Sequence, residues 1–107
     1  MNPRYEIRAK SEVFIYEDPV GSGKYRAAPS PFVVGEADHK LQFRNMASVP
    51  ITLDVSSFSN TGPITLGAKG SGSDKGQVEV RNNAGVFEYS ANPTVEGNSG
   101  PKVVVDL

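Results

Sequence analysis

Residues 40–45, Lys-Leu-Gln-Phe-Arg-Asn, and residues 51–56, Ile-Thr-Leu-Asp-Val-Ser, decide the fold class of this chain. In each segment apolar side chains alternate with polar ones, which is the pattern of a β-strand that buries one face. Alternation, or a run of β-branched and aromatic residues, predicts further strands at residues 4–9, 12–16, 32–34, 64–66, 77–81, 86–91 and 102–107. We therefore predict an all-β fold, a Greek-key β-sandwich or barrel of about eight strands.

Length and composition limit the domain organisation and the classes of partner. The chain has 107 residues, so residues 1–107 are expected to form one domain with one modest core. Eleven Gly and eight Pro interrupt it at short intervals, which disfavours long helices. A net charge of −1 without a basic stripe predicts no nucleic-acid partner. No apolar run approaches the roughly 18 residues of a membrane span, so membrane insertion is not expected.

The absence of cysteine excludes disulfides, thiolate nucleophiles and Cys-based metal sites. Residues 1–10 lack the apolar core of a signal peptide. The chain is therefore expected to be either cytoplasmic or the mature form of an exported protein with a starting Met added. The function hypothesis given below favours the second of these, with a periplasmic or extracellular location.

Several short motifs were candidates for chemistry. Gly21-Ser-Gly-Lys24 and Gly70-Ser-Gly72 lack both the full glycine pattern of a phosphate-binding loop and a following helix, so we interpret them as flexible loops. The single histidine, His39, cannot alone hold zinc or copper tightly. A Ser–His–Asp triad with Asp38 or Asp54 lacks a Gly-x-Ser-x-Gly motif.

The acidic pairs also do not indicate a catalytic or metal-binding site. Glu17-Asp18 precedes a proline and is typical of a turn, and Glu36 with Asp38 flanks the start of a strand. A calcium ion needs six or more oxygen ligands arranged around it, and no acidic loop of that kind is present. We therefore predict no catalytic, cofactor-binding or metal-binding residues, no cofactor and no enzymatic activity.

One ordered series of features points to a known family. Phe43-Arg-Asn45 ends one predicted strand and Val49-Pro50-Ile51 opens the next. Residues 85–91, Gly-Val-Phe-Glu-Tyr-Ser-Ala, then precede a polar loop and a Val-rich last strand. This order resembles the cupredoxin family, in which Asn ends a strand, Pro-His opens the next, and Gly-x-aromatic-x-aromatic-x-Cys leads through a loop with His and Met to a final Val-rich strand. The resemblance covers residues 32–107, about 70% of the chain, and implies a cupredoxin-like sandwich.

The copper ligands that the resemblance implies are replaced at every position. Blue copper requires two His, one Cys and a weak axial ligand. Ile51 stands at the first His position and Ala91 at the Cys position, and the second His and the Met fall near Thr94 and Ser99. A second alignment gives Ser90, Pro93 and Asn98 for the last three positions. We prefer the first alignment because it keeps residues 87, 89 and 91 on the inward face.

These observations lead to a function hypothesis with one alternative. We expect a non-catalytic, copper-free, cupredoxin-like binding or interaction module of the cell envelope or a secreted protein. Its partner, a protein or a small ligand, would bind end loops or a sheet face, and the loops at 46–50, 67–76 and 92–101 would cluster at one end. The alternative is a copper-binding or electron-transfer protein that uses His39, Met46 and a carboxylate.

The strand phase also predicts which side chains are buried and which segment is mobile. The inward positions of the predicted strands should form the core: Leu41, Phe43, Ile51, Leu53, Val55, Val78, Val80, Phe87, Tyr89, Val103 and Val105. The pattern does not place Phe14, Tyr16, Tyr25 or Phe58, and an exposed aromatic patch among them would favour partner binding. Residues 67–76 offer almost no apolar side chain, so their amides should exchange rapidly.

Overall fold

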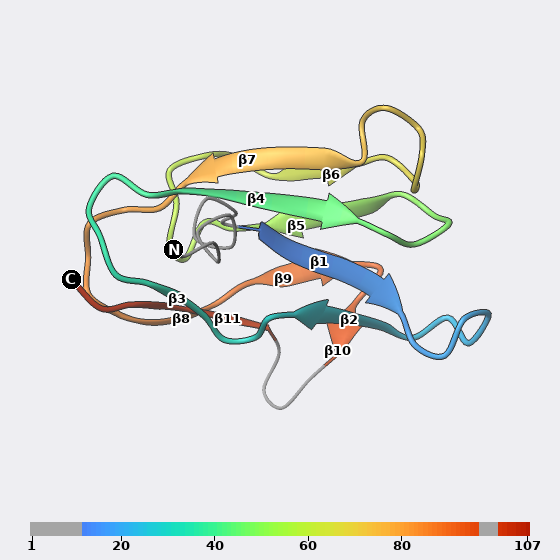
Figure 1. Cartoon of the computed structure of the whole chain (residues 1–107), viewed down its shortest axis with the longest axis horizontal. Helices are drawn as coiled ribbons and strands as arrows, with labels where there is room; N and C mark the ends of the chain where they lie inside the picture. The colour runs from blue at the N-terminus through green and yellow to red at the C-terminus, as the bar shows by residue number, and fades with distance from the viewer. Residues whose placement is uncertain (1–11, 97–100) are drawn as a thin grey trace, which may run out of the picture.

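The computed structural model describes residues 12–96 and 101–107, and every regular element in them is a β-strand (Figure 1). The strands are β1 (Glu12–Glu17), β2 (Tyr25–Ala28), β3 (Phe32–Val34), β4 (Lys40–Asn45), β5 (Ile51–Asp54), β6 (Ile64–Leu66), β7 (Lys75–Glu79), β8 (Gly85–Glu88), β9 (Ser90–Asn92), β10 (Val95–Glu96) and β11 (Lys102–Val105). The predicted all-β fold is confirmed. A search of the same residues finds no helix capable of spanning a membrane.

The described residues contain eleven strands, more than the eight or so predicted. β2 and β10 are absent from the sequence prediction because β2 has Ala at two of its four positions and β10 has only two residues, so neither shows an alternating apolar pattern. The segment predicted as one strand at 86–91 divides into β8 and β9 at Tyr89, whose backbone N–H donates to Pro101 O (3.1 Å). The strand predicted at residues 4–9 lies outside the described residues.

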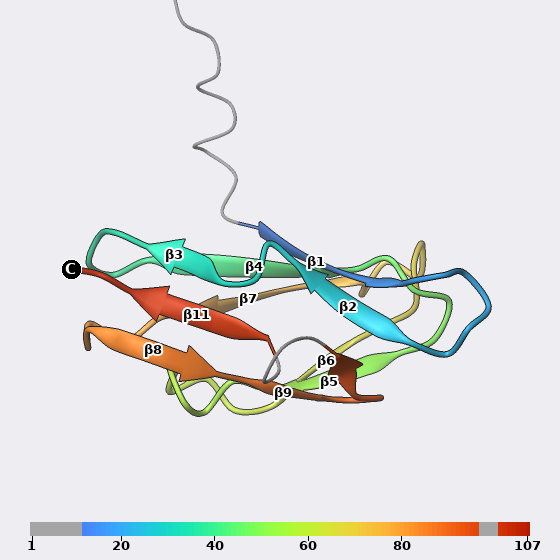
Figure 2. The same cartoon turned by 90° about the horizontal axis from the view of Figure 1, so that it is seen from below.

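The strands pair into three sheets. One has five strands in the order β10-β2-β1-β4-β7, and the others are β3-β11-β8 and β6-β5-β9. Figure 2 shows the molecule edge-on, with β1, β2, β4 and β7 in one layer and β5, β8 and β9 in the layer opposite. Within the first layer β1 pairs antiparallel with β2 and parallel with β4. This arrangement is compatible with the predicted β-sandwich.

The alternation of β4 shows how the sequence sets the core. Leu41, Phe43 and Asn45 are buried, while the residues between them face outward. In the register of the sheet Phe43 lies beside Val13 of β1, and Leu41 lies beside Val78 of β7. The inward side chains of three neighbouring strands therefore form continuous rows facing the other layer.

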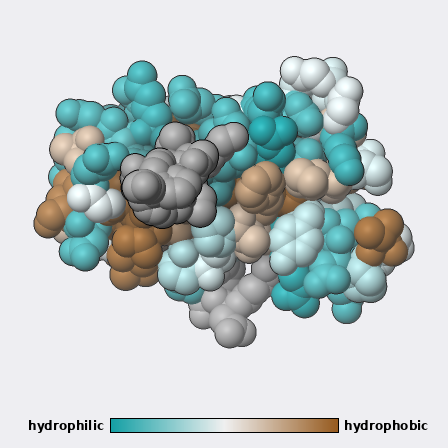
Figure 3. All heavy atoms as spheres, viewed as in Figure 1, coloured by the Kyte–Doolittle hydropathy of each residue, from teal (hydrophilic) through white to brown (hydrophobic). Residues whose placement is uncertain are grey.

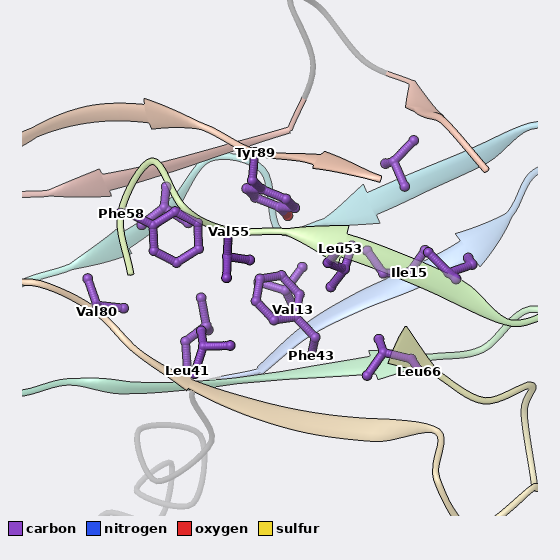
Figure 4. Close-up of a cluster of buried hydrophobic side chains, with 14 of the residues drawn as sticks. Val13, Ile15, Leu41, Phe43, Leu53, Val55, Phe58, Leu66, Val80 and Tyr89 are labelled. Atoms are coloured by element: carbon purple, nitrogen blue, oxygen red, sulfur yellow. The ribbon is translucent and has the colours of Figure 1, made fainter. Parts of the chain in front are cut away.

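The core lies between the two layers (Figure 4). Ten of the eleven side chains predicted to be buried are buried, and the exception is Phe87, which is only partly buried. Phe87 belongs to β8, which pairs only with β11 and so forms an edge of its sheet. A side chain at a sheet edge has fewer neighbours to cover it, which explains the difference.

The four unplaced aromatic residues divide evenly between core and surface. Tyr25 and Phe58 are buried, and the Phe58 ring packs edge-on against Tyr89 with 5.8 Å between centroids. Phe58 lies in a turn after β5, where its N–H donates to Val55 O (3.1 Å). Because a turn has no alternating pattern, the sequence does not predict that Phe58 is buried. Phe14 and Tyr16 belong to β1 and lie on its outward face.

The segment 67–76 is more ordered than the sequence predicts. Its last two residues belong to β7, and Gly67 N–H donates to Ser73 O (2.8 Å). Lys69 N–H donates to Ala47 O (2.8 Å), which joins this loop to the β4–β5 loop. Rapid exchange remains a prediction for the tip near Gly72, but not for the amides of Gly67 and Lys69.

Tyr89 carries a buried hydroxyl with no hydrogen-bond partner among the described residues. Burial raises its pKa well above the usual value of about 10, because the phenolate cannot be solvated there. The unfolded chain therefore ionises first, and the stability contributed by the neutral phenol is complete below pH 10 and lost above it.

Tyr89→Phe should stabilise the fold by about 1 kcal/mol at pH 7, because the ring is kept and the unpaired hydroxyl is removed. Above pH 10 the natural chain should lose about 1.4 kcal/mol per pH unit relative to the variant. Urea unfolding at pH 7, 9, 10 and 11 measures both effects. Stability curves that stay parallel up to pH 11 would show that Tyr89 is not excluded from solvent.

Candidate functional site

Two of the positions that the cupredoxin resemblance assigns to copper ligands lie in or beside the core. Ile51 is fully buried at the start of β5, and Ala91 of the adjacent strand β9 packs against the core. In the register of these strands Leu53 pairs with Ala91, one residue pair away from Thr52 and Asn92. Two apolar side chains therefore occupy neighbouring strands where the resemblance places His and Cys.

The other aligned positions are less buried than Ile51 where the structure describes them. Thr94 and Ser90 are exposed and Pro93 is partly buried, while Asn98 and Ser99 lie outside the described residues. Of the two residues aligned with the Cys position, Ala91 packs against the core and Ser90 is exposed.

His39 and Met46 are separated by the length of a strand. His39 directly precedes β4 and Met46 directly follows it, so their Cα atoms are about 20 Å apart along an extended chain. His39 Nδ1 lies 3.7 Å from Glu36 Oε1, and its ring lies 5.9 Å from that of Phe32. The structure thus does not bring together the atypical copper ligands of the alternative hypothesis. A search of the described part of the chain finds no metal-holding group of three His, Cys, Asp or Glu side chains.

The carboxylate of Asp54 is directed to a local turn rather than to a catalytic group. Its Oδ1 accepts from Ser56 N–H (3.0 Å), and this hydrogen bond lowers the pKa of Asp54. Asp38, the other aspartate considered for a triad, hydrogen-bonds Asn82 through both its backbone N–H and its carboxylate. Among the described residues, neither aspartate forms a hydrogen bond with His39.

The two glycine segments lie in loops, as predicted, whereas the turn predicted at Glu17-Asp18 begins only at Asp18, because Glu17 is the last residue of β1. Gly21 and Gly23 adopt φ angles of 86° and 75° in the loop that joins β1 to β2. Glu17 Oε2 accepts from Gly23 N–H (2.7 Å), and Asp18 N–H donates to Lys24 O (2.9 Å). Gly70 and Gly72, with φ of 81° and 89°, lie in the loop before β7. A strand, not a helix, follows each loop, so neither has the helix N-terminus of a phosphate site.

The outer face of the five-stranded sheet carries a group of outward-facing aromatic, Met and Arg side chains, here called the aromatic face. Its members are Phe14 and Tyr16 of β1, Met46 just beyond β4, Arg26 of β2 and Arg44 of β4. Phe14 and Met46 are 38% and 39% exposed. Figure 3 views this side of the molecule and shows apolar surface near its middle, next to hydrophilic surface.

The register of the sheet brings these side chains side by side. Phe14 pairs with Ala28 on one side and with Arg44 on the other, and Tyr16 pairs with Arg26. Met46 N–H donates to Ile15 O (2.7 Å), which continues the β1–β4 pairing by one residue and places Met46 next to Tyr16. Alternation along both strands then directs these side chains outward.

Carboxylates hold both arginines of the aromatic face. Glu12 Oε2 accepts from Arg44 Nε (2.9 Å) and also from Gln42 Nε2. Arg26 Nε lies 3.6 Å from Asp18 Oδ2. The register therefore places each arginine next to an aromatic residue, and each arginine has a carboxylate partner within the chain.

A cleft of about 500 Å³ opens at one end of the sandwich and is here called the polar cleft. Asp38 lines it from the β3–β4 turn, Asn60 and Thr61 line it from the β5–β6 loop, and the run 79–83 (Glu-Val-Arg-Asn-Asn) lines it from the end of β7. Lys40 and Glu79 pair at this end of the sheet, whereas Asn45 N–H donates to Asp74 O (2.7 Å) at the other. The cleft therefore lies away from the loops expected to form the binding end.

Hydrogen bonds fix the cleft walls. Asp38 N–H donates to Asn82 Oδ1 (2.8 Å), and Asn82 Nδ2 donates to Asp38 Oδ1 (3.1 Å). Asp38 adopts φ of 57°, a left-handed conformation that costs free energy in a residue with a side chain. Arg81 Nη2 donates to Ser56 O (2.9 Å) and Ser57 O (2.7 Å), which ties the β5–β6 loop to the end of β7.

The sequence pattern predicts part of the aromatic face and none of the polar cleft. The alternation of residues 12–16 already predicts that Phe14 and Tyr16 share a face, but only the pairing of β1 with β2 and β4 adds the arginines and Met46. The polar cleft combines three segments that are more than 15 residues apart, and none of them carries a motif. Comparison with protein-family models, curated proteins and solved structures finds no match for this chain in any of the three.

Proposed function

We propose that this chain is a non-catalytic binding module of the cell envelope or a secreted protein, and that it binds a partner protein through the aromatic face. The observation that carries the proposal is the outward-facing group of Phe14, Tyr16 and Met46, of which Phe14 and Met46 are exposed, beside Arg26 and Arg44. Aromatic residues, Met and Arg are the types enriched where proteins bind one another. Rigid aromatic side chains on a sheet also lose little conformational entropy on binding.

A cupredoxin-like ancestry that has lost blue copper is the second part of the proposal. Three features support it: Asn45 ends β4, Ile51 opens β5, and a Val-rich strand β11 ends the fold. Ile51 and Ala91 place aliphatic side chains, both part of the core packing, where the resemblance implies His and Cys. Because the sequence contains no Cys, the thiolate bond of a blue-copper centre cannot form.

A protein is favoured over a nucleic acid as the occupant of the aromatic face. Stacked aromatic residues and arginines also serve single-stranded nucleic acids, but such sites use unpaired cations to hold phosphates. Here Glu12 and Asp18 hold the two arginines, and the whole chain has a net charge of −1. Phosphates would therefore meet carboxylates as well as guanidinium groups, whereas a neutral protein surface would not be repelled.

Site-specific photocrosslinking tests the proposal. With p-benzoylphenylalanine in place of Phe14, the chain should crosslink to one partner protein in its native cells, whereas the same probe at Val86 should not. Val86 is a matched control because it is 63% exposed and lies on a strand of a different sheet. With the purified partner, Phe14→Ala and Met46→Ala should each weaken binding about tenfold or more, since central anchors typically contribute over 1 kcal/mol.

Two results would contradict this assignment. Crosslinks at position 86 and none at position 14 would move the interface to the sheet formed by β3, β11 and β8. Equal losses of affinity for Val86→Ala and Phe14→Ala would show that binding does not depend on the aromatic face.

A further inference from the structure

The polar cleft is a second surface feature, separate from the aromatic face, and its inference does not depend on the proposed function. Its volume of about 500 Å³ lies within the roughly 300–1,000 Å³ of small-molecule sites. Most such sites are apolar, but here every lining residue except Val80 is polar or charged. The cleft therefore suits a ligand that gains more from hydrogen bonds than from apolar contact.

Charges of both signs in the polar cleft disfavour simple ions. Asp38 and Glu79 supply carboxylates, and neither forms an ion pair that the structure records. Arg81 supplies a guanidinium in the cleft, and Lys40 pairs with Glu79 in the β4–β7 register. An anion would be repelled by the two carboxylates, and a cation attracted to them would also meet the positive charge of Arg81, whereas a neutral ligand would meet neither repulsion.

The hydrogen bonds of Arg81 argue against a ligand carboxylate. A guanidinium holds a carboxylate best through two parallel N–H bonds, and each of its two pairing edges includes Nη2. Both bonds of Arg81 Nη2 go to the carbonyl oxygens of Ser56 and Ser57. The remaining Nε and Nη1 point from different edges, so they suit separate hydroxyl acceptors better than one carboxylate. This also disfavours a zwitterionic amino acid.

The remaining groups provide both acceptors and donors. Asp38 keeps one carboxylate oxygen beyond its bond to Asn82, and Glu79 contributes two more oxygens. Asn60, Thr61 and Asn83 can each donate and accept. A hydroxyl group also donates and accepts, so a compound with several neighbouring hydroxyls matches this mixture.

From these observations we infer that the polar cleft binds a neutral saccharide. The left-handed Asp38, held by reciprocal bonds to Asn82, fixes one wall before the ligand arrives. The hydrogen bonds from Arg81 to Ser56 and Ser57 hold the β5–β6 loop, which forms another wall of the cleft. Because the cleft is open and lacks an aromatic ring, the expected dissociation constant is in the millimolar range.

NMR titration of the full ¹⁵N-labelled chain tests this inference with cellobiose, maltose and N,N′-diacetylchitobiose as separate probes. At least one of them should cause saturable shifts of the Asn60 and Asn83 side-chain amides and of the backbone amides of 79–83. Asn83→Ala should weaken that binding at least fivefold, and Asn60→Ala should have a similar effect. Gln77→Ala is the matched control, because Gln77 is an exposed amide on β7 outside the cleft, and it should leave the affinity within twofold.

Putrescine, citrate and glycine serve as the cationic, anionic and zwitterionic comparison probes. The inference is overturned if none of the three saccharides shifts these resonances at 50 mM, or if an ionic probe binds more tightly than every saccharide. It is also overturned if Asn83→Ala and Gln77→Ala have equal effects. Since Asn83 and Asn60 are exposed, both variants should fold, and unchanged spectra elsewhere in the chain will verify this.

Discussion

Phe43→Ala should lower the free energy of unfolding by about 4 kcal/mol, from lost transfer energy and the cavity left behind. Phe43 is fully buried between the layers, and its ring packs edge-on against Tyr89 with 5.3 Å between centroids. Urea denaturation followed by fluorescence or circular dichroism measures the loss.

Phe14→Ala is the matched control for this measurement. Phe14 has the same side chain, lies on the neighbouring strand β1, and is 38% exposed on the outer face. Its loss should cost about 1 kcal/mol, because less apolar area is buried and water can fill the space. Equal losses for the two variants would show that the inward and outward phases of β1 and β4 are wrong.

Asn45→Ala should cost a similar amount, about 4 kcal/mol, although it removes few apolar contacts. Asn45 is fully buried, its Nδ2 donates to Val49 O (2.8 Å) and Gly67 O (3.0 Å), and its Oδ1 accepts from Ala47 N–H (2.8 Å). Alanine leaves these three backbone groups without their partner, and each buried unsatisfied group costs about 1–3 kcal/mol.

Asn60→Ala is the control for Asn45, because Asn60 is exposed and should change stability by less than about 0.5 kcal/mol. Amide exchange adds a local measurement: in Asn45→Ala the Ala47 amide should exchange faster, while the amides of β11 should change only as global stability does. A loss below about 1 kcal/mol for Asn45→Ala would mean that water replaces its hydrogen bonds.

The alternation of polar and apolar residues predicted the strand phase well where strands are long enough to show it. In β4 and β5 every position predicted to face inward is buried, from Leu41 to Leu53. The alternation did not predict the burial of Phe58 and Tyr25, because Phe58 lies in a turn and Tyr25 begins a short strand with two Ala. Their burial depends on what lies across the sandwich, which local periodicity does not contain.

The candidate surfaces were predictable only as far as they are local. The outward position of Phe14 and Tyr16 follows from β1 alone, but their proximity to Arg26 and Arg44 depends on which strands pair. The polar cleft is less predictable still, because Asp38 and Asn82 meet through hydrogen bonds between segments 44 residues apart. Single-sequence patterns therefore indicate faces, whereas clefts need the topology.

The positions of β1 and β11 have a consequence for how the chain folds. β1, the first described strand, lies in the middle of its sheet between β2 and β4, and β11, the last, lies between β3 and β8. Neither sheet can be completed until residues distant in the chain have met. Long loops must therefore close in the transition state, and the entropy cost of closing them comes before the stabilisation from strand pairing. We expect refolding on the slow, millisecond-to-second side of small domains. Until residues 102–105 are synthesised, a growing chain leaves the facing edges of β3 and β8 unpaired, which exposes two strand edges to aggregation until β11 has formed.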